Sequence, residues 1–530
     1  MDARDGHSTQ RMAKAARSHA MTTTDEDDLG RGRKVNPALL VAVFLGTFMA
    51  LLDMSIVTVA LPAIQSDLSA GLAGIQWVID SYVLCLSSLM LSGGALGDRY
   101  GRKRLWLSGV VLFTAGSALC AVASDLPVLV GGRLVQGMAA ALLVPGALSI
   151  LTQSFPHAAQ RARLIGWWGM FGGLSVVLGP VLGGLLVDQF GWRSIFLINV
   201  PLGLLTLSLG VAAIPESADP AHASVDVPGQ ALGVLWLGAL SYALITGRGV
   251  GWTSPPTLTM LVVAIVAFVA FIVAELRADH PMLPVRYFAS ATFAVTNAVS
   301  FMLGFGSYAI FFFLSLYLQQ VRHHSATAAG LRFLPLCGAI MLVSVVSGRL
   351  TGRHGPRMPM IGGYSLIGLG LLGMCLFEPD TSDLVIGLVF AVTGLGMGMA
   401  LPATNASVFI TVPRQRSGSA AATVNATRQT GTALGVAILG GIISDCAVPV
   451  AHQLLEPYGM SDSARQRLAE SIVLHHGAAP ATDGLLPPTP AAEIFAQAFA
   501  SGFHVSAAVA GAVSLTAAVF VAVTRWEASE

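Results

Sequence analysis

Length, composition and charge leave few classes of protein open. The chain has 530 residues, of which 54% are hydrophobic and only 11% are Asp, Glu, Lys or Arg, against about 25% charged residues in an ordinary globular protein. A soluble protein of this size lacks the charged side chains to cover its surface, so a soluble enzyme is strongly disfavoured. The 29 basic and 28 acidic residues nearly cancel, and no basic excess points to nucleic acid.

The chain begins with a polar stretch and continues as a series of apolar ones. Residues 1–36 show no periodicity and predict a disordered cytoplasmic tail. A helix needs about 20 apolar residues to cross a bilayer, and lipid offers backbone groups no other partner. Fourteen stretches meet this length: 38–63, 75–97, 105–123, 127–152, 163–187, 194–214, 228–246, 257–275, 291–319, 327–348, 358–377, 382–405, 418–444 and 500–524. We therefore expect an all-α integral membrane protein with fourteen transmembrane helices.

The basic residues set the expected orientation of these helices. Twenty-one of the 29 Lys and Arg residues fall in the segments on the same side as the N-terminus, five on the other side and three within spans. The positive-inside rule therefore predicts that both termini are cytoplasmic. The longest outer segment, about 445–499, contains the stretch Ser461–His476, which predicts a short surface helix with Leu468 and Ile472 on one face.

A repeated sequence marks two inner turns. The segments 94–104 and 348–357 share Gly, Leu, Arg and Gly at equal spacing, and each follows an apolar run. Internal repeats at matching membrane positions are typical of secondary transporters. We interpret the first copy as a tight turn whose charges stabilise one conformation, although a plain positive-inside loop has the same composition. The candidate switch residues are Gly94, Asp98, Arg99, Gly101 and Arg102.

Several motifs together resemble the major facilitator superfamily, specifically its fourteen-helix drug:proton antiporter branch. Segment 94–104 resembles the superfamily's loop signature between helices 2 and 3, and segment 52–62 is similar to the first-helix motif of the branch. Segment 133–137 resembles the helix-4 motif, and Gly179–Gly184 the helix-5 antiporter motif. The later half contributes matches up to about residue 440, including Arg428 before Gly431.

The resemblance implies two six-helix bundles around a central cavity that opens alternately to each side. The N-terminal bundle is then 37–214, two extra linking helices occupy 215–286, the C-terminal bundle is 287–524 with its extracellular loop at about 445–499, and 525–530 is a cytoplasmic tail. In the family the helix-5 motif accompanies exporters, so the resemblance favours outward exchange of a drug for a proton.

An ionisable group kept inside a membrane span is a candidate functional residue, because burying it is costly. Asp53 lies in the middle of the first span, and we expect it to carry the proton and, as a second role, to act as counter-charge for a cationic substrate. Arg133, inside the fourth span, stays charged and needs a partner. We expect it to bias proton occupancy of the carboxylate, as its motif implies. The alternatives are a structural Asp and a structural Arg that binds carbonyl groups.

The remaining polar candidates lie in the second and fourth spans. Asp80 either lines the cavity or touches water at the outer interface, and Gln136 is a polar neighbour of Arg133. Trp77 and Tyr82 flank Asp80 and complete the expected substrate cavity.

The helix-5 motif also has a mechanical interpretation. Pro180 removes a backbone donor, and Gly179 and Gly183 let another helix approach closely. We expect these residues to act in the conformational switch, unless the kink is passive packing.

Other chemistry finds no support in the sequence. The five cysteines have no paired spacing, and no metal-ligand cluster or nucleotide-binding loop is found. We expect no enzyme activity, no cofactor and no metal, with a proton gradient as the energy source.

The function favoured is proton-coupled efflux of hydrophobic small molecules such as drugs or antibiotics. Its expected partners are the substrate, protons and the lipid bilayer but no nucleic acid, and we expect a monomer in the plasma membrane of a bacterium. A dedicated exporter of one endogenous metabolite and a transporter-like sensor that does not transport are the alternatives.

Overall fold

Helices make up all the regular structure that can be described. The computed structural model describes residues 36–155, 158–218, 226–278, 285–411, 417–475 and 488–526. In these ranges thirteen helices are long and apolar enough to cross a membrane. The one predicted span that is not among these thirteen, 163–187, corresponds to α6 (Ala158–Phe190), in which Leu178–Phe190 forms a shorter apolar stretch. The predicted tail 1–36 lies outside the described residues, apart from Asn36.

The helices follow the predicted spans closely. The first half of the chain contains α2 (Pro37–Asp67), α3 (Leu72–Tyr100), α4 (Arg102–Ala121), α5 (Leu126–Ser154), α6, α7 (Ser194–Leu197) and α8 (Asn199–Ala213). Two further helices are α9 (Val227–Val250) and α10 (Pro255–Arg277).

The second half begins with an interrupted helix. It contains η1 (Val285–Ala289), α11 (Ala291–Leu303), η2 (Gly304–Tyr308), α12 (Ala309–Leu316), η3 (Tyr317–Val321), α13 (Ala326–Arg332), α14 (Leu334–His354), α15 (Arg357–Gly373), η4 (Met374–Leu376), α16 (Asp383–Thr411), α17 (Ser417–Leu454), η6 (Glu456–Tyr458), α18 (Asp462–His475) and α19 (Pro488–Val523). Two of these elements, η2 and η3, are π-helical turns inside one continuous span. Such turns are frequent at functional sites.

Capping groups explain where several of these helices begin. Asn36 accepts a hydrogen bond from the Ala38 amide at 3.1 Å, and Asp125 accepts one from the Val128 amide at 2.9 Å. Asp226 does the same for the Gly229 amide at 2.8 Å. Each cap precedes a proline in the first turn, where the missing amide costs nothing.

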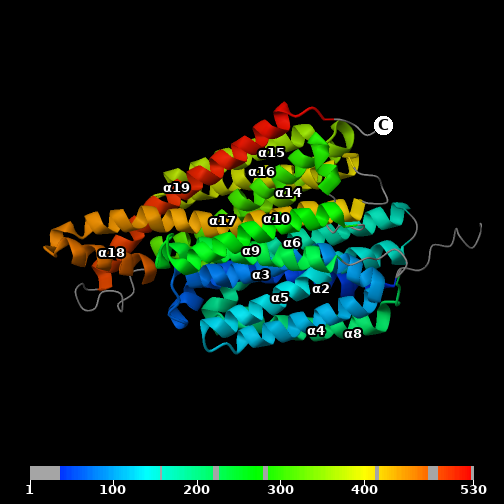
Figure 1. The fold of residues 1–530 in the computed structure, drawn as a ribbon, viewed down its shortest axis with the longest axis horizontal. Coiled ribbons are helices and arrows are strands. Elements are labelled where there is room, and N and C mark those ends of the chain that lie inside the picture. The colour runs from blue at the N-terminus through cyan, green and yellow to red at the C-terminus, as the bar shows by residue number, and fades with distance from the viewer. Residues whose placement is uncertain are drawn as a thin grey trace, which may run out of the picture.

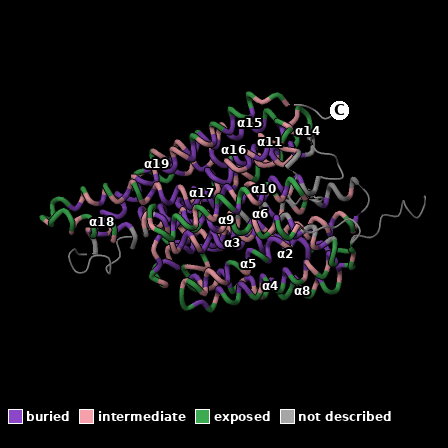
Figure 2. The backbone as a smooth tube through the Cα atoms, in the orientation of Figure 1, coloured by how far each residue is buried: buried purple, intermediate pink, exposed green. Residues whose placement is uncertain are grey.

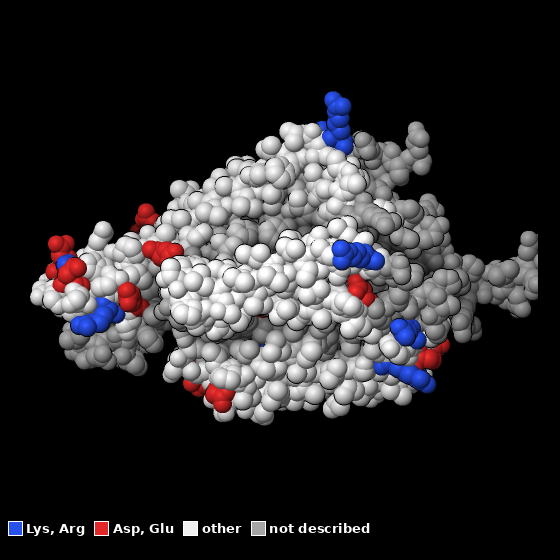
Figure 3. Space-filling view, in the orientation of Figure 1, with Lys and Arg blue, Asp and Glu red and all other residues white. Residues whose placement is uncertain are grey.

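The helices lie side by side along the long axis of the molecule, and the second-half helices α14, α15, α16 and α19 form a group beside the first-half helices (Figure 1). The helices differ in how far they are buried (Figure 2). In the most apolar stretch of α3, 72% of the residues are buried, whereas in that of α10 only 22% are. The face shown in Figure 3 is uncharged over most of the helix length, with charged residues gathered toward its ends. This distribution suits a surface surrounded by lipid.

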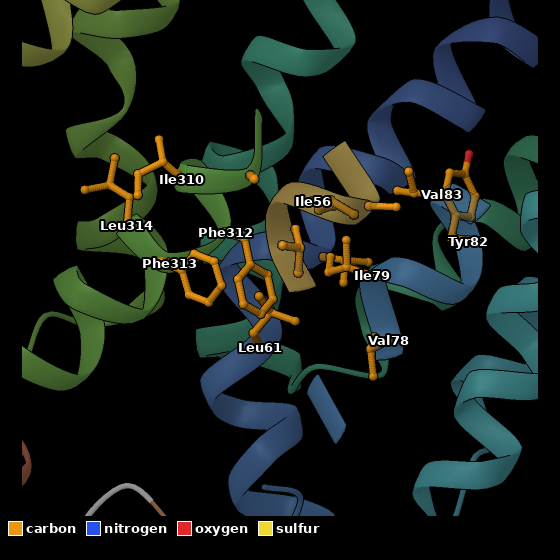
Figure 4. Close-up of a cluster of buried hydrophobic side chains, with 14 of the residues drawn as sticks. Ile56, Leu61, Val78, Ile79, Tyr82, Val83, Ile310, Phe312, Phe313 and Leu314 are labelled. Carbon is orange, nitrogen blue, oxygen red and sulfur yellow. The ribbon is translucent and has the colours of Figure 1, made fainter. Parts of the chain in front are cut away.

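Apolar side chains join the two groups of helices. Ile56 and Leu61 of α2 lie close to Phe312 and Phe313 of α12, with Ile79 of α3 beside them (Figure 4). Ile56, Leu61 and Phe313 have no exposed surface. Part of the contact between the two halves is therefore a packed apolar core.

The segment 445–499, which was predicted to be an extracellular loop, is largely helical in its described part: α17 continues to Leu454 and α19 begins at Pro488. The predicted surface helix is confirmed as α18, in which Leu468 is 4% exposed and Ile472 is fully buried. Helix α18 packs between extensions of α17 and α19 at one end of the molecule (Figure 1).

Candidate functional site

A buried ion pair lies at the centre of the N-terminal helices. The Asp53 side chain of α2 is 0% exposed and that of Arg133 of α5 is 1% exposed, and the Arg133 Nη1 donates directly to Asp53 Oδ2. The other Asp53 oxygen, Oδ1, accepts from Gln136 Nε2 and from Asn199 Nδ2, each at 2.9 Å. Three donors from α5 and α8 therefore hold one carboxylate on α2, and both of its oxygens have partners.

The rest of this network fixes the donors in place. Gln136 also donates to Ser117 Oγ at 2.7 Å, and its own carbonyl oxygen accepts from Arg133 at 2.9 Å. Arg133 Nε donates to the Val78 carbonyl at 3.0 Å. Its guanidinium lies 4.4 Å from the centre of the Tyr82 ring, a cation–π contact. The pair is thus surrounded by partners and shielded from solvent.

The arrangement defines what a proton at this site does. A neutral Asp53 no longer attracts Arg133 as an anion does, and Arg133 cannot lose its own charge. Protonation therefore weakens the link that ties α2 to α5 and α8. The group can act as a proton-dependent joint between helices.

Asp80 differs from Asp53, whose carboxylate has three hydrogen-bond donors. It is fully buried in α3, and among the described residues neither of its carboxylate oxygens has a hydrogen-bond donor. Gln76, one turn earlier, donates to the Val436 carbonyl of α17 at 3.1 Å. Asp80 therefore lies on the face of α3 that packs against α17, at the contact between the two halves.

The other expected cavity residues have different positions. Tyr82 belongs to the Asp53 network, since its ring covers Arg133 and its hydroxyl donates to the Ala50 carbonyl at 3.0 Å. Trp77 contacts Tyr242 of α9, with ring centres 6.3 Å apart. The structure brings Asp53, Arg133, Gln136 and Tyr82 together, and it places Trp77 beside one of the linking helices.

The glycines of α6 allow two close helix contacts. A β-carbon at Gly179 would lie 1.9 Å from Ser55 Oγ, and one at Gly183 would lie 2.6 Å from Val59, both on α2. On another side of α6, the Pro180 carbonyl oxygen would be 2.1 Å from a β-carbon at Gly330 of α13. Helix α6 therefore contacts α2 in its own bundle and α13 in the other.

Hydrogen bonds between the two halves concentrate toward the end of the molecule that holds the turn at residues 68–71, which we name the 68–71 end. The Asp188 carboxylate of α6 accepts from the amides of Ala326 and Thr327 at 3.2 and 2.8 Å. Gln319 donates to the Val59 carbonyl at 3.0 Å, and Gln320 donates to Gln65 at 2.9 Å. The described contacts close the 68–71 end.

The repeated turn lies at the other end. Gly101 has a φ of +109°, which a side chain disfavours, and it separates α3 from α4. Glu216 accepts from the amides of Lys103 and Arg104 at 3.1 and 3.2 Å, and Arg102 donates its amide to the Ser217 carbonyl at 2.9 Å. The segment after α8 therefore caps α4.

The other switch candidates of this turn are less informative. Arg99 is exposed beside Tyr100, and the environment of Gly94 and the side chain of Asp98 lie outside the described part of the structure.

Polar groups also cross the C-terminal helices. Tyr364 donates to the Val299 carbonyl at 3.1 Å and contacts Thr404 at 3.0 Å. Thr427 donates to Asn297 at 3.2 Å. Arg428 of α17 donates to Asn425 at 2.5 Å and lies 5.8 Å from the Tyr308 ring centre. Among the described residues no three His, Cys, Asp or Glu side chains gather as metal ligands.

Sequence reasoning missed Asn199 and Ser117 as members of the site. Both are neutral and lie in apolar helices, so neither composition nor charge distinguishes them. The feature of the sequence that pointed to Asn199 is its position at the start of an apolar stretch, in the segment Asn199–Pro201.

The fold and the buried charge network define a polytopic helical membrane protein of the transporter class. The Major Facilitator Superfamily model matches residues 43–436. A bacterial homologue of the human lysosomal transporter Spinster, solved in an inward-facing and occupied conformation, has the same fold. Its TM-score is 0.61 with 18% identity, over 92% of this chain and 96% of that one. The chain belongs to the Major Facilitator Superfamily and is a secondary transporter, in a family of transporters rather than enzymes.

Sequence relatives cover almost the whole chain. It is 36% identical over 495 residues to the multidrug resistance protein Stp of Mycobacterium tuberculosis, covering 92% of this chain and 91% of that protein. It is 34% identical to the tetracenomycin C resistance and export protein of Streptomyces glaucescens over the same shares. A riboflavin transporter, RibZ of Clostridioides difficile, is 30% identical over 77% of this chain and 88% of its own length.

Proposed function

We propose that this protein is a proton-coupled antiporter that exports hydrophobic small molecules through the bacterial plasma membrane. Relatives named for drug resistance and antibiotic export support the substrate class. The excess of basic residues on one side supports cytoplasmic termini. The protein works as a monomer in this proposal.

The observation that carries the proposal is the Asp53 carboxylate and its three donors. Asp53, Arg133 and Asn199 belong to three different helices, and Asp53 and Arg133 are fully buried. When Asp53 takes a proton, the attraction that joins α2 to α5 is reduced. Proton binding thereby favours a different packing of these helices, as coupling between binding and conformation requires.

Asp80 is the second proton-binding candidate. Its carboxyl group is buried, and among the described residues no donor reaches either oxygen, which leaves the group free to exchange a proton in this proposal. Its place against α17 lets a change of charge act directly on the contact between the halves. Asp53 then senses the proton inside one bundle, and Asp80 senses it between bundles.

Alternating access follows from the closed 68–71 end. In this proposal the cytoplasmic termini place this end outward, and the contacts of Asp188, Gln319 and Gln320 keep the outer side closed. Opening outward requires Asp188 to release the amides of Ala326 and Thr327 and requires α6 to move against α13. The close contacts of Gly179 and Pro180 make α6 the helix on which both movements depend.

The energy of one proton is sufficient for useful export. A charge that crosses 100 mV yields about 2.3 kcal/mol. At about 1.4 kcal/mol for each tenfold ratio, this supports a substrate gradient of roughly 40-fold.

A dedicated metabolite exporter is the second candidate, since one relative is named for the export of tetracenomycin C. A susceptibility panel in a bacterial host without its own pumps separates the two. Resistance to several unrelated drugs, lost in Asp53→Asn, supports broad efflux. Resistance to one compound supports a dedicated exporter, and no change with any compound contradicts drug export.

A further inference from the structure

Arg428 is a cation within a membrane span that lacks an anionic partner. It lies three residues from the middle of the predicted span 418–444. A guanidinium keeps its charge in any protein environment and offers five N–H donors. A residue of this kind inside a membrane marks a functional site unless a neighbouring group neutralises it.

The described neighbours of Arg428 are neutral. One nitrogen, Nη2, donates to Asn425 at 2.5 Å, and the Tyr308 ring lies 5.8 Å away. The Nε group is buried and has no acceptor. No carboxylate among the described residues forms an ion pair with Arg428. Arg133, by contrast, uses its donors on Asp53, Gln136 and the Val78 carbonyl.

Asp80 does not supply the missing anion in this conformation. It is the buried acid on the facing side of α3, and both of its oxygens are without a donor, so it has no hydrogen bond to Arg428. Arg428 and Asp80 therefore remain unneutralised on opposite sides of the contact between the halves.

The surroundings of Arg428 suit a binding site between the bundles. Its neighbour Gln429 contacts Met54 of α2 at 3.7 Å, so this turn of α17 reaches the other bundle. A β-carbon at Gly304 would lie 2.0 Å from the Arg428 carbonyl oxygen, which places the π-helical turn η2 directly against this part of α17. That turn ends at Tyr308, the aromatic residue beside the guanidinium.

We propose that Arg428, with Tyr308 and Asn425, binds the carboxylate of the exported molecule, so that hydrophobic carboxylic acids are the preferred substrates. A guanidinium binds a carboxylate through two parallel hydrogen bonds, and Nε together with a terminal nitrogen forms such a pair of donors. The Tyr308 ring offers an apolar surface for the adjacent part of the ligand. This inference rests on the proposed export function and names its substrate class.

The test compares two probes that differ in charge alone. Tritiated 1-naphthaleneacetate and neutral 1-naphthaleneacetamide are titrated against the purified full-length protein in nanodiscs at pH 7. We expect the acid to bind at least about tenfold more tightly than the amide. Arg428→Gln should abolish this preference and leave the affinity for the amide nearly unchanged. Arg428→Lys, which keeps the charge but not the fork of donors, should retain part of the preference.

A matched control and a second readout make the outcome decisive. Arg357→Gln removes a different arginine of the same bundle, which binds the Ala522 carbonyl at the end of α15, and should change neither affinity. The inference is wrong if the wild-type protein binds neither probe or both equally, or if Arg428→Gln keeps the preference. If Arg428→Gln fails to fold, a reduced preference in Arg428→Lys supports the inference and an unchanged preference opposes it.

Proton coupling is measured separately, so that the two proposals fail in different ways. Acid preference without substrate-driven proton movement in proteoliposomes contradicts the proposed function and leaves this inference intact. Equal handling of the two probes with intact proton coupling contradicts this inference alone.

Discussion

The buried pair of Asp53 and Arg133 gives a prediction whose size follows from the structure. Asp53→Asn keeps one oxygen that can accept from Gln136 and Asn199, but it turns an amide donor toward the Arg133 donor. It also leaves a charge that is 1% exposed without a counter-charge. Breaking a buried pair by removing one partner costs about 3–5 kcal/mol. We expect a loss of stability of this size.

The double variant separates the pair from its surroundings. Arg133→Met replaces the guanidinium by an apolar side chain, and buried pairs often tolerate replacement of both members. Asp53→Asn with Arg133→Met should therefore be more stable than the sum of the single losses predicts, by about 2–3 kcal/mol. Unfolding in mixed detergent and dodecyl sulfate micelles, followed by circular dichroism, measures all four proteins. A coupling energy near zero would refute the idea that this pair joins the helices.

The remaining predictions concern the moving contacts. Gly179→Ala should lower both stability and export, because its β-carbon would lie 1.9 Å from Ser55 Oγ. Adding Ser55→Gly to this variant should restore part of both. If Gly179→Ala left export unaffected, the role of α6 would be contradicted. Asp188→Asn should open the 68–71 end and raise maleimide labelling of a Val59→Cys probe several-fold, whereas unchanged labelling would show that Asp188 does not hold this end closed. Burial and the nearby Arg332 and Arg322 hold the pKa of His324 below its usual value of 6.5, so the unfolded chain binds this proton more readily and stability falls as the pH drops below about 6.5. His324→Gln should flatten that part of the pH profile of stability, and an unchanged slope would contradict this.

The spans were predictable because the membrane imposes a length and an apolar composition on each. The starts of α5 at Leu126 and of α9 at Val227 agree with the predicted 127 and 228, and the structure shows that the side chains of Asp125 and Asp226 cap these first turns. The two π-helical turns were not predictable, since η2 and η3 lie in sequence that reads as an uninterrupted apolar helix. Tertiary contacts with α17 and α19, not local propensity, accompany them.

The site was predictable where charge drew attention to it. Asp53, Arg133 and Gln136 were expected together, and the structure brings them into hydrogen-bonding contact. Asn199 could not be found this way, because a neutral amide in an apolar helix resembles a packing residue until its partner is known. Asp188 was missed for a different reason: it lies near the end of α6, where an acidic residue usually faces water, and its partners are backbone amides of the other bundle.

Proton release from liposomes tests the central claim most directly. Proteoliposomes loaded with the pH dye pyranine are prepared acid inside, and a substrate identified by the susceptibility panel is added outside. The account predicts that substrate entry drives protons out, that an uncoupler which collapses the gradient abolishes substrate accumulation, and that Asp53→Asn shows neither effect. Accumulation that persists after the gradient has been collapsed would contradict it.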